Sequence, residues 1–132
     1  MKISATIVNS YQNNTVELRT NDSVQHLTVP HKTSGYGSAV NGGEFLFLAL
    51  ATCFCNDIYR EAGKRNIKIT HVAVEVSGEF SGEGEPGDNI TYKVKIDGDA
   101  TTETLAELVR HTDAVAEIHN TLRIGREVLL LD

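Results

Sequence analysis

Two cysteines, Cys53 and Cys55, have the widest range of chemistry in this chain. A thiolate is a nucleophile that a peroxide oxidises to a sulfenic acid, so either residue could carry a redox reaction. A disulfide between them is disfavoured, because residues two apart on a helix point about 200° away from each other. The alternative is that both are inert core thiols, since free cysteine is among the most buried residue types.

A reactive Cys53 requires a cation to stabilise its thiolate. Cys53 lies nine residues beyond Glu44, well past the first helical turn, where the helix dipole lowers a thiol pKa. The cation must therefore come from another segment of the chain. The available residues are Arg19, His31, Lys32, His119, Arg123 and Arg126.

No metal or cofactor site is predicted. The five histidines form no pair at i, i+4 on one helix, and His111 and His119 are interpreted as solvent-facing or capping residues. The glycine-rich stretch 35–43 lacks the GxxxxGK[ST] pattern of a phosphate-binding loop, so a nucleotide is not expected there.

Length and charge limit the class of protein. A chain of 132 residues predicts a single domain over residues 1–132, and a net charge of −6 disfavours nucleic acid or an anionic membrane as the main partner. The longest apolar run, residues 45–55, is far shorter than the ~20 residues that span a bilayer. The first residues alternate apolar and polar, unlike a secretory signal. A cytoplasmic protein with reduced thiols is expected.

Alternating residues predict three strands over 2–9, 15–20 and 24–29, with tight turns at Asn13-Asn14 and Asn21-Asp22. A Gly- and Ser-rich loop follows over residues 31–43. The helix over 44–63 is expected to start with a capping box between Asn41 and Glu44 and to end at Gly63. Its first half is apolar on every side, which predicts burial all round.

The C-terminal half predicts a hairpin over 67–80 and 90–96, because each strand has one apolar and one polar face. Two helical pieces, 103–110 and 113–122, and a final strand over 126–131 complete the order βββ-α-ββ-αα-β. The fold class is therefore α+β, in a single domain with no linker.

The buried helix also carries a resemblance to a known family. Residues 43–54 (GEFLFLALATCF), 62–76 (AGKRNIKITHVAVEV) and 119–122 (HNTL) resemble the OsmC/Ohr family. The resemblance implies antiparallel sheets wrapped around a central helix in an intertwined homodimer, with active sites at the subunit interface. Many members reduce organic hydroperoxides with a reactive cysteine, a resolving cysteine and an Arg–Glu pair.

Carried over residue by residue, the resemblance places Cys53 at the reactive cysteine and Glu44 at the helix-start glutamate. The resolving cysteine aligns with Ala116, and the family's arginine meets Tyr11-Gln12-Asn13-Asn14, with Arg19 on the next strand. The two catalytic residues expected are therefore Cys53 and Glu44.

Two functions stay open at this point. In the first, Cys53 reduces an organic hydroperoxide and an external thiol regenerates it. In the second, the homodimer binds a small apolar or thiol-containing ligand in its interface cleft without chemistry. The absent resolving cysteine motivates the second reading.

Overall fold

The computed structural model describes all 132 residues, and it divides into two compact units, residues 1–45 and 46–132. The expectation of one domain over the whole chain stays a prediction. The mixture of antiparallel strands and three helices confirms the predicted α+β class.

The N-terminal unit contains a three-stranded antiparallel sheet in the order β1-β2-β3, formed by β1 (Ile3–Ser10), β2 (Asn13–Thr20) and β3 (Ser23–His26). This confirms the predicted meander. The second turn is where expected, with Asn21 at φ 51°. The first was predicted two residues too late, because Gln12 takes the left-handed conformation (φ 50°) and Asn13 and Asn14 already pair with β1.

Helix α1 (Gly42–Lys64) begins with the predicted capping box. The backbone N–H of Glu44 donates to Oδ1 of Asn41 at 2.8 Å, and that of Asn41 donates to the Glu44 carboxylate at 3.1 Å. The prediction that Gly63 ends the helix was wrong. Asn66 (φ 54°) supplies the left-handed residue instead, and the N–H of Ile67 reaches the carbonyl of Ala62. This is a Schellman cap built on asparagine.

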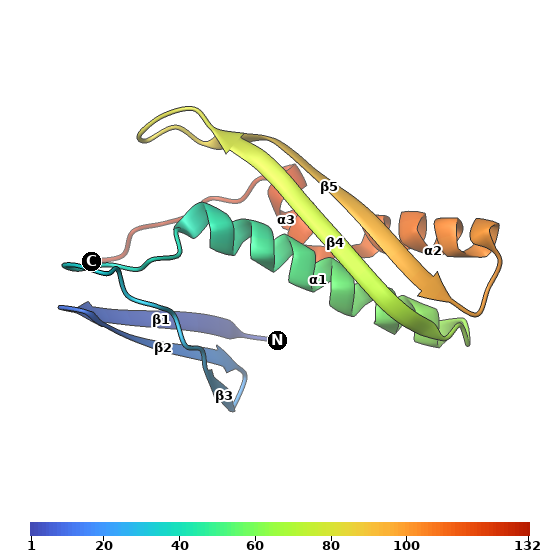
Figure 1. Cartoon of the computed structure of the whole chain (residues 1–132), viewed down its shortest axis with the longest axis horizontal. Coiled ribbons are helices and arrows are strands. Elements are labelled where there is room, and N and C mark those ends of the chain that lie inside the picture. Colours follow the sequence, from blue (N-terminus) through green and yellow to red (C-terminus); the bar gives the residue numbers. More distant parts are fainter. The chain divides into compact units, whose positions relative to one another are not determined.

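The C-terminal unit joins the hairpin of β4 (Ile69–Phe80) and β5 (Gly87–Gly98) to α1, α2 (Thr102–Val115) and α3 (Glu117–Ile124) (Figure 1). The helical break was predicted between residues 110 and 113, but it lies at Ala116, whose extended backbone (φ −71°, ψ 109°) is both the end of α2 and the start of α3. The break matters because it turns the first residues of α3 toward α1.

The core of this unit lies between α1, the hairpin and α2. Its fully buried members are Phe54, Ile58, Ala62, Leu108 and Ala116, and the inward residues of β4 and β5 pack against them. Burial of the first half of α1 on every side stays a prediction, because Leu48 is 58% exposed here and no partner chain is present to cover it. Within this unit, the hairpin and the other helices leave part of the α1 surface uncovered.

The predicted final strand over residues 126–131 does not form in this structure. Val128 and Leu130 are almost fully exposed, and no neighbouring strand edge pairs with the segment. A strand needs such an edge for its hydrogen bonds. No helix in the structure is long and apolar enough to cross a bilayer.

Candidate functional site

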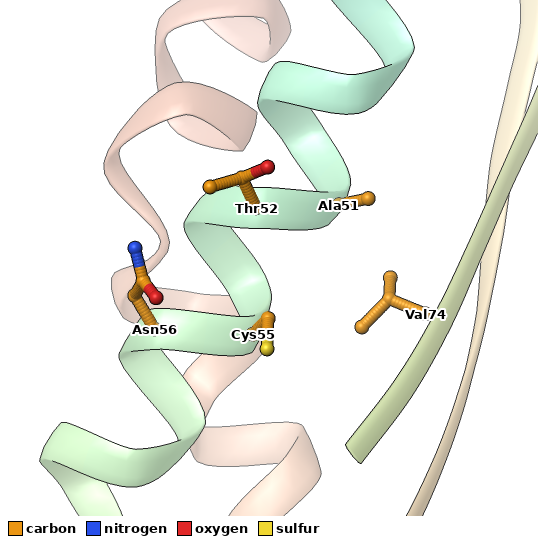
Figure 2. A pocket seen from close by; sticks show the side chains of 5 residues that line it. All are labelled: Ala51, Thr52, Cys55, Asn56 and Val74. Atoms are coloured by element: carbon orange, nitrogen blue, oxygen red, sulfur yellow. The ribbon is translucent and has the colours of Figure 1, made fainter.

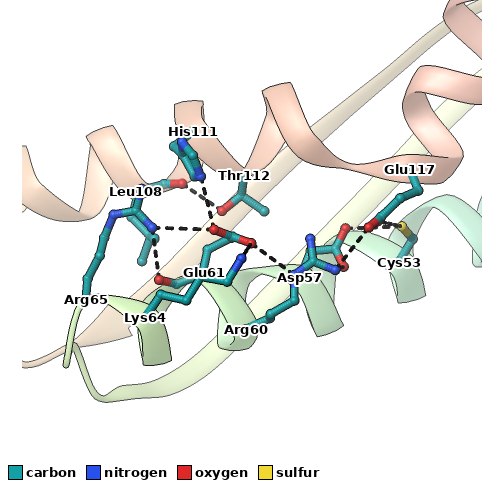
Figure 3. A network of polar contacts seen from close by, with 10 residues as sticks. All are labelled: Cys53, Asp57, Arg60, Glu61, Lys64, Arg65, Leu108, His111, Thr112 and Glu117. Carbon is teal, nitrogen blue, oxygen red and sulfur yellow. Dashed lines mark hydrogen bonds and ion pairs between the residues drawn. The ribbon is translucent and has the colours of Figure 1, made fainter.

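The Cys53 thiol lies on the face of α1 that is turned toward α3 (Figure 3). Its sulfur donates a hydrogen bond to Oδ2 of Asp57, one helical turn further on, at 3.4 Å. It also lies 4.0 Å from Oε2 of Glu117, in the first turn of α3. Cys53 is partly exposed, so its sulfur is not sealed inside the core.

Arg60 compensates the charge of both carboxylates. Its Nη1 lies 2.8 Å from Oδ1 of Asp57 and 3.2 Å from Oε1 of Glu117. Cys53, Asp57 and Arg60 follow one another at i, i+4 and i+7, which places their side chains on one face of α1. A cation from another segment that stabilises the Cys53 thiolate is not seen here: Arg60 belongs to α1 and pairs with the two carboxylates, not with the sulfur.

Burial raises the pKa of the Cys53 thiol. The hydrogen bond to Asp57 and the negative charges of Asp57 and Glu117 raise it further, whereas a backbone hydrogen bond from Ile118 lowers it. The net effect is a raised pKa, so the thiol is protonated at neutral pH.

Asp57 is a suitable acceptor for that proton. Burial raises the pKa of its carboxyl group, and Glu117 raises it as well, against the hydrogen bond from Cys53 and the charge of Arg60. A carboxylate with a raised pKa is a stronger base than an exposed one. Asp57 is therefore within hydrogen-bond distance of the thiol, and its raised pKa makes it a better proton acceptor than an exposed aspartate.

The amino end of α3 faces the Cys53 sulfur. Ala116, the N-cap, supplies no side-chain capping bond, and the first N–H groups of a helix have no partner within the helix. One of them, the N–H of Ile118, makes the backbone hydrogen bond that favours the Cys53 thiolate. These groups and the helix dipole favour negative charge on the sulfur or on an oxygen bound to it.

A second carboxylate holds this site in place. Glu61 is buried, and it accepts hydrogen bonds from Arg60 (2.9 Å) and Lys64 (2.9 Å) and pairs with His111 of α2 (3.0 Å) (Figure 3). The hydrogen bonds from Lys64 and Arg60 lower the pKa of Glu61 to about 2. The network fixes Arg60 from one side and ties α1 to α2. His111 is thus a hydrogen-bond partner of Glu61 and not a free surface residue.

The same cluster offers three potential metal ligands. Sγ of Cys53 and carboxylate oxygens of Asp57 and Glu117 lie within 4.8 Å of one another. Sulfur and carboxylate ligands together suit Zn²⁺. Arg60, however, already pairs with both carboxylates, and a metal ion would have to displace its guanidinium. The arrangement is better suited to proton transfer at the thiol.

Cys55 lies on another side of α1, toward Val74 of β4 (Figure 2). It lines an open pocket of about 260 Å³ together with Ala51, Thr52, Asn56 and Val74. Because Cys53 faces α3 and Cys55 faces β4, the two sulfurs cannot meet without unwinding the helix. Both cysteines are free thiols, as the sequence predicted.

The family model described as "OsmC-like protein" matches residues 35–129. The chain belongs to this OsmC-like family. The match includes α1 with Cys53, the β4–β5 hairpin and both C-terminal helices. It confirms the resemblance seen in the sequence motifs. A search of curated proteins found no match.

Solved structures show the same fold. An OsmC-like protein from Mycoplasma pneumoniae is 17% identical, with a TM-score of 0.61 over 91% of this chain and 87% of that chain. An OsmC-like protein of unknown function from Vibrio cholerae is 9% identical, with a TM-score of 0.57 over 90% and 93%. An OsmC-like hydroperoxide resistance protein from Jannaschia is 12% identical, with a TM-score of 0.55 over 96% and 88%. At these identities the comparisons establish the fold alone.

The structure brings together a different set of residues from the predicted pair. Cys53 lies in the cluster, whereas Glu44 lies two and a half helical turns earlier on α1 and caps the helix start. A catalytic role for Glu44 stays a prediction. Ala116, at the position of the absent resolving cysteine, is the residue at the α2–α3 break and is fully buried.

Sequence reasoning missed Asp57, Arg60 and Glu117. The i, i+4, i+7 spacing of Cys53, Asp57 and Arg60 was a visible signal that all three lie on one helix face. Nothing in the sequence pointed to Glu117, because its approach depends on the break at Ala116.

Proposed function

We propose that this protein reduces organic hydroperoxides through Cys53. The observation that carries the proposal is the setting of the sulfur, between a carboxylate that can take its proton and the amino end of α3 that favours an anion. The Jannaschia protein that shares this fold is described as a hydroperoxide resistance protein, which is consistent with this assignment.

In the proposed reaction, Asp57 accepts the thiol proton as the sulfur attacks the terminal peroxide oxygen. A sulfur–oxygen bond forms and the oxygen–oxygen bond breaks, so Cys53 becomes a sulfenic acid and the hydroperoxide becomes an alcohol. The proton returns from Asp57 to the departing alkoxide oxygen. The N–H of Ile118 stabilises the negative charge on sulfur during the attack.

An external thiol completes the cycle. One thiol displaces water from the sulfenic acid to give a mixed disulfide, and a second thiol releases Cys53 as a thiol. Ala116 replaces the resolving cysteine, and Cys55 faces β4, so no second cysteine of this chain is placed to do this. Such thiols are abundant in the reducing cytoplasm, where we place the reaction.

The proposal is tested by hydroperoxide consumption with dithiothreitol as the reductant. We expect Cys53→Ser to abolish the consumption of tert-butyl hydroperoxide and Cys55→Ser to keep most of it. Cys55 is the matched control, since it is the other thiol on α1. Equal rates in the wild type and Cys53→Ser would refute the proposal.

Glu44 enters the proposal through the family resemblance. Its carboxylate also accepts the capping hydrogen bond from Asn41. Glu44→Gln separates the two roles, because glutamine keeps an acceptor for the cap and removes the charge. A catalytic Glu44 predicts slower hydroperoxide reduction with an unchanged unfolding midpoint.

The raised pKa of Cys53 favours a second candidate function, in which the protein binds a small apolar or thiol-containing ligand without chemistry. This function predicts that Cys53 reacts with iodoacetamide no faster than an ordinary buried cysteine. It also predicts no hydroperoxide consumption at neutral or alkaline pH, whereas the peroxidase reading predicts consumption that increases with pH.

We further propose that the protein is a homodimer. Large apolar side chains are exposed on several elements, including Leu48 (58%) and Phe80 (51%). Exposed apolar surface of this kind is typical of an interface. A second copy would also offer a strand edge to the unpaired segment around Val128 and Leu130.

A further inference from the structure

His119 is a buried polar residue without a polar partner. Its side chain is 5% exposed, and neither ring nitrogen has a hydrogen-bond partner among the surrounding protein groups. The aromatic rings of Tyr92 and Phe54 pack around it, with centroids 4.7 and 5.9 Å from the imidazole. We expected this histidine at the surface or at a helix cap, and that expectation was wrong. Buried polar groups normally have a partner, so this exception needs an explanation.

The polar groups nearest to His119 are already engaged with one another. Asp113 accepts hydrogen bonds from the hydroxyl of Tyr92 and from Nη2 of Arg123. Nη1 of Arg123 donates to the backbone carbonyl of Asp113 and to Asn120. This arrangement pairs Arg123 with Asp113 and leaves the imidazole without a partner.

His119 lines a cavity of about 220 Å³ within the C-terminal unit. The other lining residues are Leu50, Ile90, Leu122 and Arg123. The walls are therefore largely apolar, with polar groups from one histidine and one arginine. A cavity of about 150 Å³ accommodates benzene, so this one has room for an aromatic ring with a short chain.

The protonation state of the His119 imidazole limits which chemical groups can hydrogen-bond to it. Burial and the charge of Arg123 lower the pKa of His119, so the ring is neutral at pH 7. A neutral imidazole has one nitrogen that donates and one that accepts. A hydroxyl group can pair with either nitrogen, whereas a carboxylate only accepts and an ammonium group only donates.

We propose that this cavity binds a small apolar molecule that carries one hydroxyl group, with the hydroxyl against His119 and the apolar part between Leu50, Ile90 and Leu122. The ring nitrogens are covered in the absence of ligand. The rim residues Leu122 and Arg123 are exposed, and rotation of such side chains on binding is common. The cavity shares no lining residue with the Cys53 cluster, and the proposal does not rest on the peroxidase function.

The test uses the full chain and the probe 4-propylphenol, with propylbenzene and 4-propylbenzoate as matched molecules that lack the hydroxyl. We expect 4-propylphenol to bind more tightly than both and to shift the ¹⁵N resonances of the His119 ring in NMR spectra. Equal binding of propylbenzene, tighter binding of 4-propylbenzoate, or an unchanged His119 resonance would overturn the proposal.

Two variants make the test independent of folding defects. His119→Phe keeps an aromatic ring against Phe54 and Tyr92, and we expect it to weaken 4-propylphenol binding about fivefold, as the loss of one hydrogen bond predicts. Leu122→Trp fills the cavity from its exposed rim and should abolish binding with the histidine intact. His71→Phe, at an exposed position of β4, is the control and should bind like the wild type.

Binding is also measured in Cys53→Ser, so that the two proposals fail separately. We expect 4-propylphenol to bind this variant as it binds the wild type, whatever its effect on hydroperoxide consumption. Loss of binding in Cys53→Ser would overturn the assignment of a separate site.

Discussion

At the scale of single residues, a hydrogen bond joins Cys53 to Asp57. The thiol donates to Oδ2 of Asp57 at 3.4 Å, and both groups have a raised pKa, each mainly through burial. Removing the charge of Asp57 lowers the thiol pKa but also removes the group that returns a proton to the leaving alkoxide. The first consequence should make alkylation of Cys53 faster, and the second should make hydroperoxide reduction slower.

We therefore expect Asp57→Asn to have opposite effects on alkylation and on catalysis. Alkylation of Cys53 by iodoacetamide at pH 8 should become several-fold faster, because more of the sulfur is thiolate below its pKa. Hydroperoxide reduction should become slower by about tenfold or more, the usual effect of losing a general acid–base group. In the wild type, the alkylation rate should continue to increase with pH beyond the pH range in which an ordinary thiol titrates, because the pKa of Cys53 is raised.

Asp97→Asn is the matched control, at an exposed position on β5. It should change neither rate. A parallel fall of both rates in Asp57→Asn would show that Asp57 only supports the local structure.

At the scale of elements, α1 is defined by its two caps. The Asn41–Glu44 box was predicted because both partners lie within four residues of each other. The Schellman cap on Asn66 was missed, because glycine is the residue type that normally adopts the left-handed conformation at a helix end. Gly63, however, is helical, and Asn66 adopts that conformation instead. Local sequence signals therefore predicted the helix and its N-terminal end, but not its C-terminal end.

Asn41→Ala should lower the free energy of unfolding by about 1 kcal/mol, because the N–H of Glu44 then loses its acceptor at the exposed start of α1. Urea denaturation monitored by circular dichroism measures the change. An unchanged midpoint would contradict the importance of this cap.

Two glycines of the C-terminal unit should respond to alanine in opposite directions. A Cβ at Gly98 would lie 2.7 Å from the backbone oxygen of Lys68 and 2.9 Å from Cδ1 of Ile69, so Gly98→Ala should be destabilising by about 1–3 kcal/mol. A Cβ at Gly63 meets nothing within 4 Å, and Gly63→Ala should be stabilising by about 0.5–1 kcal/mol. Thermal unfolding of the two variants decides this, and a stabilised Gly98→Ala would refute the packing described here.

At the scale of the whole molecule, the proposed homodimer would account for two sequence expectations. Burial of α1 on every side and a final strand over 126–131 both require surfaces that the C-terminal unit alone does not supply. The strands, the helices and the Cys53 position were predictable from local periodicity and motifs. The approach of Glu117 and the burial of His119 were not, because both depend on contacts between distant segments.

Sedimentation velocity tests the assembly. We expect a dimer at micromolar concentration, and we expect Leu48→Glu, which places a charge on an exposed apolar position of α1, to shift the population toward monomer. Thr20→Glu, at the exposed end of β2, should have a much smaller effect. A wild-type monomer under these conditions would contradict the proposed dimer.

The most direct test of the proposed chemistry is to find the oxygen atom on the sulfur. The reduced protein is treated with an equimolar amount of cumene hydroperoxide in the presence of dimedone, which traps sulfenic acids, and its peptides are analysed by mass spectrometry. We predict a dimedone adduct on Cys53 and none on Cys55. An adduct on Cys55 alone, or no adduct while the hydroperoxide is consumed, would contradict the account.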